Sequence, residues 1–256
     1  MKWNAADYAA NSVVQQTWAR ELIARLELRG NERILDVGCG DGKITAELAR
    51  ALPQGGVKGI DASPHMIEFA RAAFPDVEFH VMDARHIQFD RRFDLIFSNA
   101  ALHWVDDHQA FLRGAASVLR PGGRLIVSCG GKGNAQEVFL ALRPEMRLKR
   151  WREFFRRLEK PYFFHAPADY EKWLPRFGFK TRRVQLVPKD ATYEGRAVFA
   201  GWLRTTWLPY TQRVPESSRE EFIAAVVERY VAKHPPDGQG RVHVRMVRLE
   251  IDAVKV

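Results

Sequence analysis

Short apolar runs alternate with amphipathic segments through the first half of the chain. The runs that predict strands are residues 33–37, 57–60, 77–82, 93–98 and 124–128. Apolar residues at helical spacing predict helices before and between them, over residues 12–28, 43–52, 64–73 and 109–119. Strands that alternate with helices form parallel sheets with right-handed crossovers. The pattern therefore predicts an α/β fold with a mostly parallel sheet flanked by helices.

The regular alternation ends near residue 130, beyond the predicted turn at residues 120–123. Two further runs, residues 179–187 and 242–251, mix polar and apolar positions and predict two more strands, which complete a seven-stranded sheet. Between them lies a helical insertion before the last strand, residues 188–240, which includes an amphipathic helix at residues 219–232. Insertions of this size often cover a site.

We expect a single domain over residues 1–256. Its regular core is residues 30–130, where strands and helices alternate, and the helical elements at residues 131–178 and 188–240 lie outside this core.

Composition is that of an ordinary globular protein, with 46% hydrophobic and 28% charged residues. The start of the chain lacks a basic segment followed by an apolar one, and no stretch is apolar enough for a membrane span, so the expected location is cytoplasmic. Cys39 and Cys129 are too few for a disulfide framework and lack metal-ligand spacing. We expect two reduced thiols and no metal site.

A formal net charge of +9 suits an anionic partner but does not say which kind. The densest basic run is Arg147, Lys149, Arg150, Arg152, Arg156, Arg157 and Lys160. Apolar residues at helical spacing accompany it, which predicts a helix over residues 146–160. This helix presents either a solvated face or a phosphate track, and the pattern leaves both open.

The sharpest motif is residues 34–42, ILDVGCGDG, in which a strand runs into three alternate glycines and then a helix. Glycines at 38, 40 and 42 allow a tight turn and a close approach of the backbone to a ligand, while the helix N-terminus offers unpaired N–H groups. The dinucleotide fingerprint needs glycine where Lys43 stands. A nucleotide-like ligand other than NAD or FAD is therefore expected.

Acidic residues stand at or near the ends of three successive predicted strands: Asp36, Asp61 and Asp83. Each alone is as well explained as a helix cap. Together they line the crevice where α/β sheets bind ligands, and a carboxylate at the second strand suits two ribose hydroxyls.

This ordered set resembles the class I S-adenosylmethionine-dependent methyltransferases, with their Rossmann-like fold. The matching segments are ILDVGCGDG, GIDASPHMIEFA, VMDARHI, FDLIFSNAALHWV and LRPGGRLIVS. The resemblance implies that S-adenosylmethionine is the cofactor and that residues 30–130 are its binding core. It also implies that the helical elements at residues 131–178 and 188–240 lie on the side of the acceptor substrate. It places the glycine loop at the amino-acid moiety, Asp61 at the ribose, Asp83 at adenine, and the segment after the fourth strand at the methyl group. The implied cofactor residues are Asp36, Gly38, Cys39, Gly40, Gly42, Asp61, Ala62, Ser63, Met66, Asp83, Ala84, Asn99 and Ala100.

More narrowly, WNAADYAANS at the start, LHW after the fourth strand and GGKGN at residues 130–134 resemble the trans-aconitate and juvenile hormone acid methyltransferases. Those enzymes methylate carboxylates, so O-methylation of a carboxylic acid by in-line transfer is expected. We expect a small acceptor substrate that is acidic and has an apolar body. The protein itself is expected to be a monomer or a homodimer. The candidate acceptor-binding residues are Tyr8, Trp104, Asn134, Trp202, Arg204 and Trp207.

His103, with Asn99, is the candidate catalytic residue beside the expected methyl position. An ionised carboxylate needs no general base, whereas a C- or hydroxyl-O-methyltransferase would use His103 as one. His103 is equally explained as a packed residue, and Arg204 as a surface one. An RNA methyltransferase is disfavoured because nucleic-acid recognition motifs are missing, and a cofactor-binding protein without catalysis stays open.

Overall fold

The computed structural model describes residues 13–90 and 92–256 of the chain. These residues form two compact units. The sheet unit comprises residues 15–132, 162–187 and 248–256, and the helical unit comprises residues 13–14, 133–161 and 188–247.

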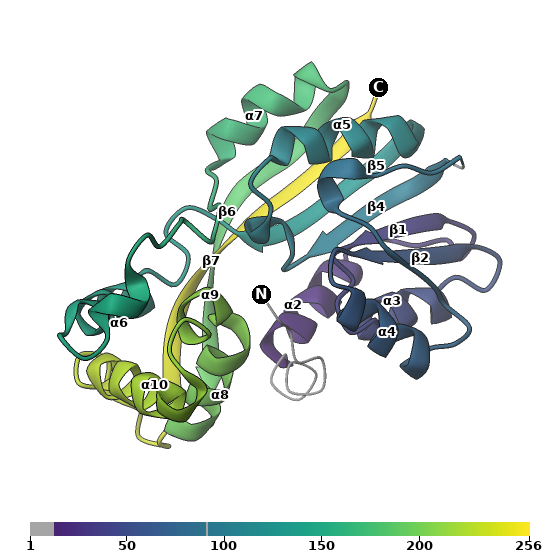
Figure 1. The fold of residues 1–256 in the computed structure, drawn as a ribbon. Coiled ribbons are helices and arrows are strands. Elements are labelled where there is room, and N and C mark those ends of the chain that lie inside the picture. Colours follow the sequence, from purple (N-terminus) through teal and green to yellow (C-terminus); the bar gives the residue numbers. More distant parts are fainter. Residues whose placement is uncertain (1–12, 91) are drawn as a thin grey trace. The chain divides into compact units, whose positions relative to one another are not determined.

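A seven-stranded sheet runs in the order β3-β2-β1-β4-β5-β7-β6 (Figure 1). Its strands are β1 (Arg33–Val37), β2 (Gly56–Asp61), β3 (Glu78–Val81), β4 (Phe93–Asn99), β5 (Leu119–Gly130), β6 (Phe179–Tyr193) and β7 (Val242–Lys255). The neighbours from β3 to β5 pair in parallel, and β7 is antiparallel to β5. The predicted α/β class and mostly parallel sheet are confirmed.

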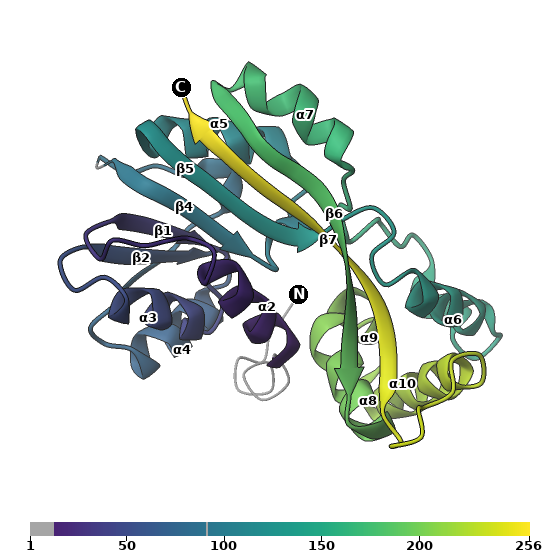
Figure 2. The ribbon, with the colours of Figure 1, turned by 180° about the vertical axis from the view of Figure 1, so that it is seen from behind.

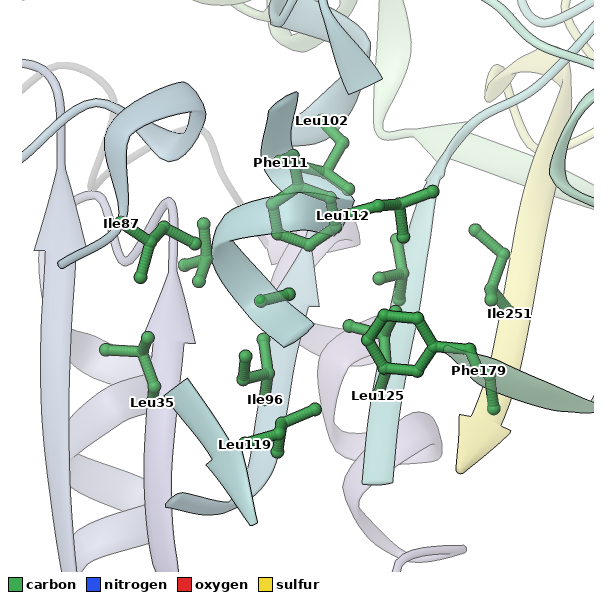
Figure 3. Packing of buried hydrophobic residues seen from close by; sticks show 14 of the residues in the cluster. Leu35, Ile87, Ile96, Leu102, Phe111, Leu112, Leu119, Leu125, Phe179 and Ile251 are labelled. Atoms are coloured by element: carbon green, nitrogen blue, oxygen red, sulfur yellow. The ribbon is translucent and has the colours of Figure 1, made fainter. Parts of the chain in front are cut away.

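Helices cover both faces of the sheet (Figure 2). One face carries α5 (His108–Val118) and α7 (Pro167–Arg176), and the other carries α2 (Val13–Ile23), α3 (Lys43–Arg50) and α4 (Pro64–Ala73). Each strand contributes apolar side chains to the hydrophobic cores on both faces of the sheet, because successive side chains along a strand point to opposite faces. Leu35 of β1 joins Phe111 in the cluster under α5 (Figure 3). Ile34 joins the cluster under α2 and α3.

Local sequence signals set the ends of these helices. Ser63 caps α4, with Pro64 at its first position, and Asp107 caps α5 by accepting a hydrogen bond from the backbone N–H of Ala110 at 2.9 Å. The predicted turn at residues 120–123 lies within β5 as a bulge: Phe93 pairs with Leu119, and Leu95 already pairs with Arg124. The turn signal was therefore placed correctly, but it does not end the strand pairing.

The helical unit contains α6 (Gln136–Arg147), α8 (Gly195–Thr206), α9 (Leu208–Thr211) and α10 (Glu216–Val231). The strand residues 188–193 and 242–247 group with it. Helix α10 packs against α6 and α8. The core of the helical unit is largely aromatic. The rings of Phe199 and Trp202 stack with their centroids 5.8 Å apart, and the ring centroid of Tyr230 lies 4.9 Å from that of Phe199.

The prediction of one helix over residues 146–160 is wrong. Helix α6 ends at Arg147, because Leu148 adopts an extended backbone, and only the short 3₁₀ helix η3 (Arg152–Phe155) follows. Trp151 is buried against Phe222, so tertiary packing decides this segment rather than helical periodicity. Several of its arginines form surface ion pairs, among them Arg150 with Glu221.

One further observation concerns the acceptor-side elements. Helix α7, within the range expected on the acceptor side, groups with the sheet unit, where Tyr170 and Leu174 enter the main core.

Within the described residues, no helix combines the length and apolar character needed to cross a membrane.

Candidate functional site

The glycine loop joins β1 to α3 at the C-terminal edge of the sheet. Gly38, Gly40 and Gly42 all have positive φ, at 77°, 54° and 81°. A Cβ on Gly38 would lie 2.1 Å from the Cβ of Ala101, in the segment after β4. The loop therefore requires glycine both for its backbone conformation and for its contact with that segment.

Asp36 lies just before the loop and is almost completely buried. Its Oδ2 accepts a hydrogen bond from the Thr45 hydroxyl at 2.7 Å. Burial, opposed by this hydrogen bond and assisted by the charge of Asp61, raises the pKa of Asp36 to about 7. A buried carboxyl of this kind is ready to ionise against an incoming positive charge.

Asp61, at the end of β2, is half-buried and holds the loop in place. Its Oδ2 accepts from the backbone N–H of Gly40 at 3.1 Å, and its Oδ1 accepts from that of Ser63 at 2.8 Å. Burial raises the pKa of Asp61, and the two backbone bonds oppose the rise. Because a carboxylate offers about four acceptor positions, each oxygen retains capacity for a hydroxyl donor.

The residues after Asp61 form the start of α4. The Ser63 hydroxyl accepts from the backbone N–H of Met66 at 3.4 Å, and Ala62 is exposed. Met66 is 3% exposed and packs into the interior. Ser63 thus has a capping role that is independent of any ligand.

Asp83, after β3, forms a bidentate ion pair that the sequence reasoning missed. Arg85 donates to both of its oxygens, with Nη2–Oδ2 at 2.7 Å, and also reaches Asp106. This partner lowers the pKa of Asp83. An adenine amino group at Asp83 would have to share the carboxylate with Arg85, while the neighbouring Ala84 packs against the main core.

Asn99 ends β4 and is fully engaged within the sheet unit. Its Nδ2 donates to the carbonyl of Gln15 in α2 at 3.1 Å, and its Oδ1 accepts from Nη2 of Arg248 in β7 at 3.2 Å. Ala100 follows with φ of 57°, an uncommon value for alanine. The carboxamide therefore ties three segments together at the centre of the edge.

His103 stands in the short 3₁₀ helix η2 (Leu102–Trp104). Its Nδ1 accepts from the backbone N–H of Gly130 at 3.3 Å, so the proton of the neutral ring is on Nε2. Burial, then the charge of Arg248, lowers the pKa of His103 to about 3. The imidazole is held neutral and can donate through Nε2.

Aromatic rings surround His103. Trp104 meets Tyr162 edge-on at 4.8 Å, and Tyr162 stacks on Phe164 at 5.6 Å. The His103 ring lies 6.1 Å from Phe164. The sequence reasoning named Trp104 and missed the other two, although the run Tyr162-Phe163-Phe164 before α7 was the available signal.

Arg248 is a further residue that the sequence reasoning missed, and it is 4% exposed. Its Nε donates to the Ser128 hydroxyl at 3.2 Å, and its guanidinium lies 5.3 Å from the Trp18 ring centroid. No motif marks this arginine, which stands in a strand where arginines alternate with apolar residues. Only the pairing of β7 with β5 brings it to the C-terminal edge of the sheet.

The structure places the other acceptor candidates in the helical unit. Trp202 and Trp207 are buried with their rings 5.8 Å apart. Arg204 forms a bidentate ion pair with Glu220 on α10, with Nε–Oε1 at 2.7 Å. Asn134 accepts from the backbone N–H of Val247 at 3.0 Å, and Tyr8 lies outside the described residues.

Both cysteines are buried and free, and burial raises the pKa of each thiol, that of Cys129 to about 12. Cys39, in the glycine loop, packs with Ile67 and Phe79 under α4. The thiols are held in the protonated, unreactive form.

The edge fits a cationic nucleoside. The loop cannot accept side chains at its tightest glycine, and Asp61 keeps acceptor capacity for two hydroxyls. Asp36 adds a buried carboxyl close to the loop. These features match the chemistry of S-adenosylmethionine, which carries a ribose and a positive sulfonium.

Comparison with known proteins agrees with this chemistry. Residues 34–123 match the methyltransferase domain family. Trans-aconitate 2-methyltransferase of Rhizobium etli is 30% identical over 258 residues, covering 100% of both chains. The protein of that name from Shigella flexneri serotype 5b is 32% identical over 254 residues, covering 98% of this chain and 97% of its own. In fold, phosphoethanolamine N-methyltransferase 2 of Haemonchus contortus, in complex with S-adenosyl-L-methionine, matches with a TM-score of 0.61 and 15% identity, over 98% of this chain and 56% of that one.

The chain belongs to the class I S-adenosylmethionine-dependent methyltransferases. Its cofactor is S-adenosylmethionine, and its likeness to the trans-aconitate 2-methyltransferases extends over the whole chain.

Proposed function

We propose that this methyltransferase transfers the methyl group to a carboxylate oxygen of a small organic acid. The observation that carries the proposal is the state of His103. Its Nδ1 already accepts a backbone N–H, and burial lowers its pKa to about 3. So weak a base does not suit an alcohol or carbon acceptor, which must lose a proton. A carboxylate is ionised at neutral pH and attacks without a base.

The cofactor supplies an activated methyl group on a positive sulfonium. The chain's own residues align the acceptor and exclude water around it. His103 donates from Nε2 to a carboxylate oxygen, and the rings of Trp104, Tyr162 and Phe164 form a low-dielectric wall. Attack of a carboxylate on a sulfonium turns two opposite charges into neutral products, so removal of water favours the reaction.

The names of the relatives support the same acceptor class, since trans-aconitate is a carboxylic acid. We assign Asp61 to the ribose and the glycine loop to the amino-acid moiety of the cofactor, and Asp83 to adenine together with Arg85.

A methyl-transfer assay tests the proposal. Purified protein is incubated with methyl-labelled S-adenosylmethionine and a panel of trans-aconitate, aliphatic and aromatic acids, and alcohols of matched skeleton. We expect label in a product that mild alkali releases as methanol, because esters hydrolyse and ethers do not. Label found only in alkali-stable products from the alcohols would overturn the proposal.

The His103→Asn variant separates the two chemistries. With a carboxylate acceptor we expect kcat to fall less than about tenfold, because only one hydrogen bond is lost, whereas loss of a general base costs roughly 100-fold or more. His80→Asn, at a half-buried position on β3, is the matched control. A collapse of kcat in a folded His103→Asn variant with normal cofactor affinity argues for a base.

A further inference from the structure

A histidine and a tyrosine are hydrogen-bonded to each other inside the hydrophobic core under α5. His108 is the first residue of α5, Tyr170 belongs to α7, and both are almost completely buried. The Tyr170 hydroxyl lies 2.6 Å from Nδ1 of His108, and Nε2 of His108 lies 2.8 Å from the carbonyl oxygen of Leu102. Polar groups in an apolar core cost free energy unless their hydrogen bonds are made, as they are here. The pair therefore has a directional role that apolar side chains of similar size would not fill.

The partners of His108 fix where its proton lies. A carbonyl oxygen only accepts, so Nε2 donates to Leu102 and Nδ1 accepts from the Tyr170 hydroxyl. Burial, followed by the charge of His165, lowers the pKa of His108 to about 4, so the ring keeps this neutral form at neutral pH. The chain of hydrogen bonds ends at a backbone carbonyl and passes no proton to a ligand. Its effect is to hold the Leu102 carbonyl in one direction.

The Leu102 carbonyl belongs to the peptide group that leads into His103. A peptide group is planar, so the direction of its carbonyl also sets the direction of the N–H and Cα of His103. The same carbonyl accepts from the backbone N–H of Val105 at 2.9 Å, which closes η2. The His103 carbonyl accepts from the backbone N–H of Phe163 at 2.9 Å, and its ring accepts from that of Gly130. These bonds tie η2 to the segment before α7 and to β5.

His108 supplies the directional tie on the side of α5. The Leu102 side chain packs with Phe111 and Leu112 of that helix (Figure 3). Apolar packing is not directional, whereas a hydrogen bond to the carbonyl restricts rotation of the peptide group. Loss of the bond from His108 would let this peptide tilt, and the ring of His103 would turn with it.

We infer that His108, oriented by Tyr170, is a positioning residue for methyl transfer, because it sets the direction in which Nε2–H of His103 points. The inference rests on the proposed function, in which His103 donates to the acceptor carboxylate. In-line transfer depends on alignment, so a small tilt of this donor lowers the rate. His108 touches neither reactant and acts through His103. Its removal should therefore cost no more activity than removal of the His103 imidazole.

Steady-state kinetics at saturating S-adenosylmethionine test the inference, with trans-aconitate or the acid of the panel that is methylated fastest. His108→Phe keeps a ring and removes both hydrogen bonds, so kcat/KM for the acid should fall about three- to tenfold. Tyr170→Phe removes the hydroxyl alone and should cost about two- to fivefold. His108→Gln again offers a donor and an acceptor, and should restore kcat/KM to within about twofold of the wild type.

Val118→Ala is the matched control for lost stability, because Val118 is the last residue of α5 and belongs to the same cluster. It should leave kcat/KM for the acid within about twofold of the wild type, although it also opens a cavity in this core. Wild-type kcat/KM in His108→Phe, or an equal loss in Val118→Ala, overturns the inference. An equal loss of S-adenosylhomocysteine affinity in His108→Phe also overturns it, because His108 would then act on the cofactor.

A double-variant cycle shows whether His108 acts through His103. In a His103→Asn background, His108→Phe should change kcat/KM by less than about twofold, because the group that it positions is already gone. Losses that multiply in the double variant show independent effects and overturn the inference. If His108→Phe does not fold, Tyr170→Phe takes its place in the cycle, since it loses only a hydroxyl.

Nitrogen NMR of labelled histidines gives a readout that needs no acceptor. The ring signals of His103 are assigned by their loss in His103→Asn. They should shift in His108→Phe and Tyr170→Phe and stay in place in Val118→Ala, because only the first two variants release the Leu102 carbonyl. Unchanged His103 signals in both of those variants overturn the inference.

The outcomes separate this inference from the proposed function. If only alcohols are methylated and the cycle still shows His108 acting through His103, the positioning role stands and the carboxylate function fails. If wild type and His108→Phe form the methyl ester with equal kcat/KM, the carboxylate function stands and the positioning role fails.

Discussion

The sheet unit and the helical unit place their charges differently. In the sheet unit, Asp36 and Arg248 are buried at the edge of the sheet. In the helical unit, Arg204 and Arg196 pair with glutamates at the surface, the buried Glu145 is paired with Arg229, and much of the interior is aromatic.

The difference shows where chemistry and where packing dominate. A buried charge costs free energy unless a partner or a function offsets it, whereas an exposed ion pair is nearly neutral in free energy. Substitutions at the edge of the sheet should therefore change ligand affinity, and substitutions in the helical unit should change stability or acceptor choice.

The largest effect is expected at the glycine loop. Gly38→Val should abolish measurable binding of S-adenosylhomocysteine, because its Cβ would overlap Ala101 and its φ is positive. Gly56→Ala is the control, since a Cβ there meets nothing within 4 Å. Calorimetry decides, and normal affinity in Gly38→Val would remove the loop from the site.

Next is Trp207→Ala in the core of the helical unit. Truncation of a buried tryptophan should lower the free energy of unfolding by about 3 kcal/mol or more, because it leaves a cavity beside Phe139 and Trp202. Denaturant unfolding measures the loss, with Trp207→Phe as a milder control. If the folded variant also lost S-adenosylhomocysteine affinity, the division of roles between the units would be wrong.

Asp61→Ala should weaken cofactor binding by about 2 kcal/mol, roughly 30-fold in Kd, because it removes charge-assisted hydrogen bonds to the ligand and two that hold the loop. Asp76→Ala, at an exposed position after α4, is the control. Calorimetric affinity for S-adenosylhomocysteine is the measurement. An unchanged value in a folded Asp61→Ala variant would exclude this carboxylate from the site.

A pH dependence should follow from Asp36, whose pKa is raised to about 7. The neutral form stabilises the fold fully below the ordinary pKa of about 4, and this contribution is lost as pH rises through about 7. The sulfonium favours the ionised form, so its affinity should rise about tenfold between pH 6 and pH 8. Measurements of cofactor affinity across this pH range, with Asp36→Asn as the control, test whether Asp36 causes the pH dependence. If the affinity of Asp36→Asn rose with pH in the same way, the pH dependence would have to come from another group.

The smallest effect is expected for Arg204→Ala. The lost ion pair with Glu220 is exposed, so the free energy of unfolding should change by less than about 1 kcal/mol. The KM for an acidic acceptor should move less than about twofold, within the range of an ordinary surface substitution. Steady-state kinetics with Glu220→Ala as the matched control decide. A tenfold rise in KM specific to Arg204→Ala would make Arg204 the acceptor ligand that the sequence predicted.

The sequence by itself determined the α/β class and the positions of all seven strands, with differences at their ends. Strand alternation and helix periodicity are local, and so are the glycine spacing and the acids after the strands. Asp36 and the glycine loop could be found because they are neighbours in the sequence, and Asp61 could be found because it directly follows a predicted strand.

Only the tertiary structure decided the parts that depend on distant residues. Burial of Trp151 overrode the helical periodicity of residues 146–160. Arg248 reaches the edge of the sheet because β7 pairs antiparallel with β5, more than a hundred residues earlier in the chain. The neutral state of His103 likewise depends on burial and on that arginine, and no local pattern encodes either of them.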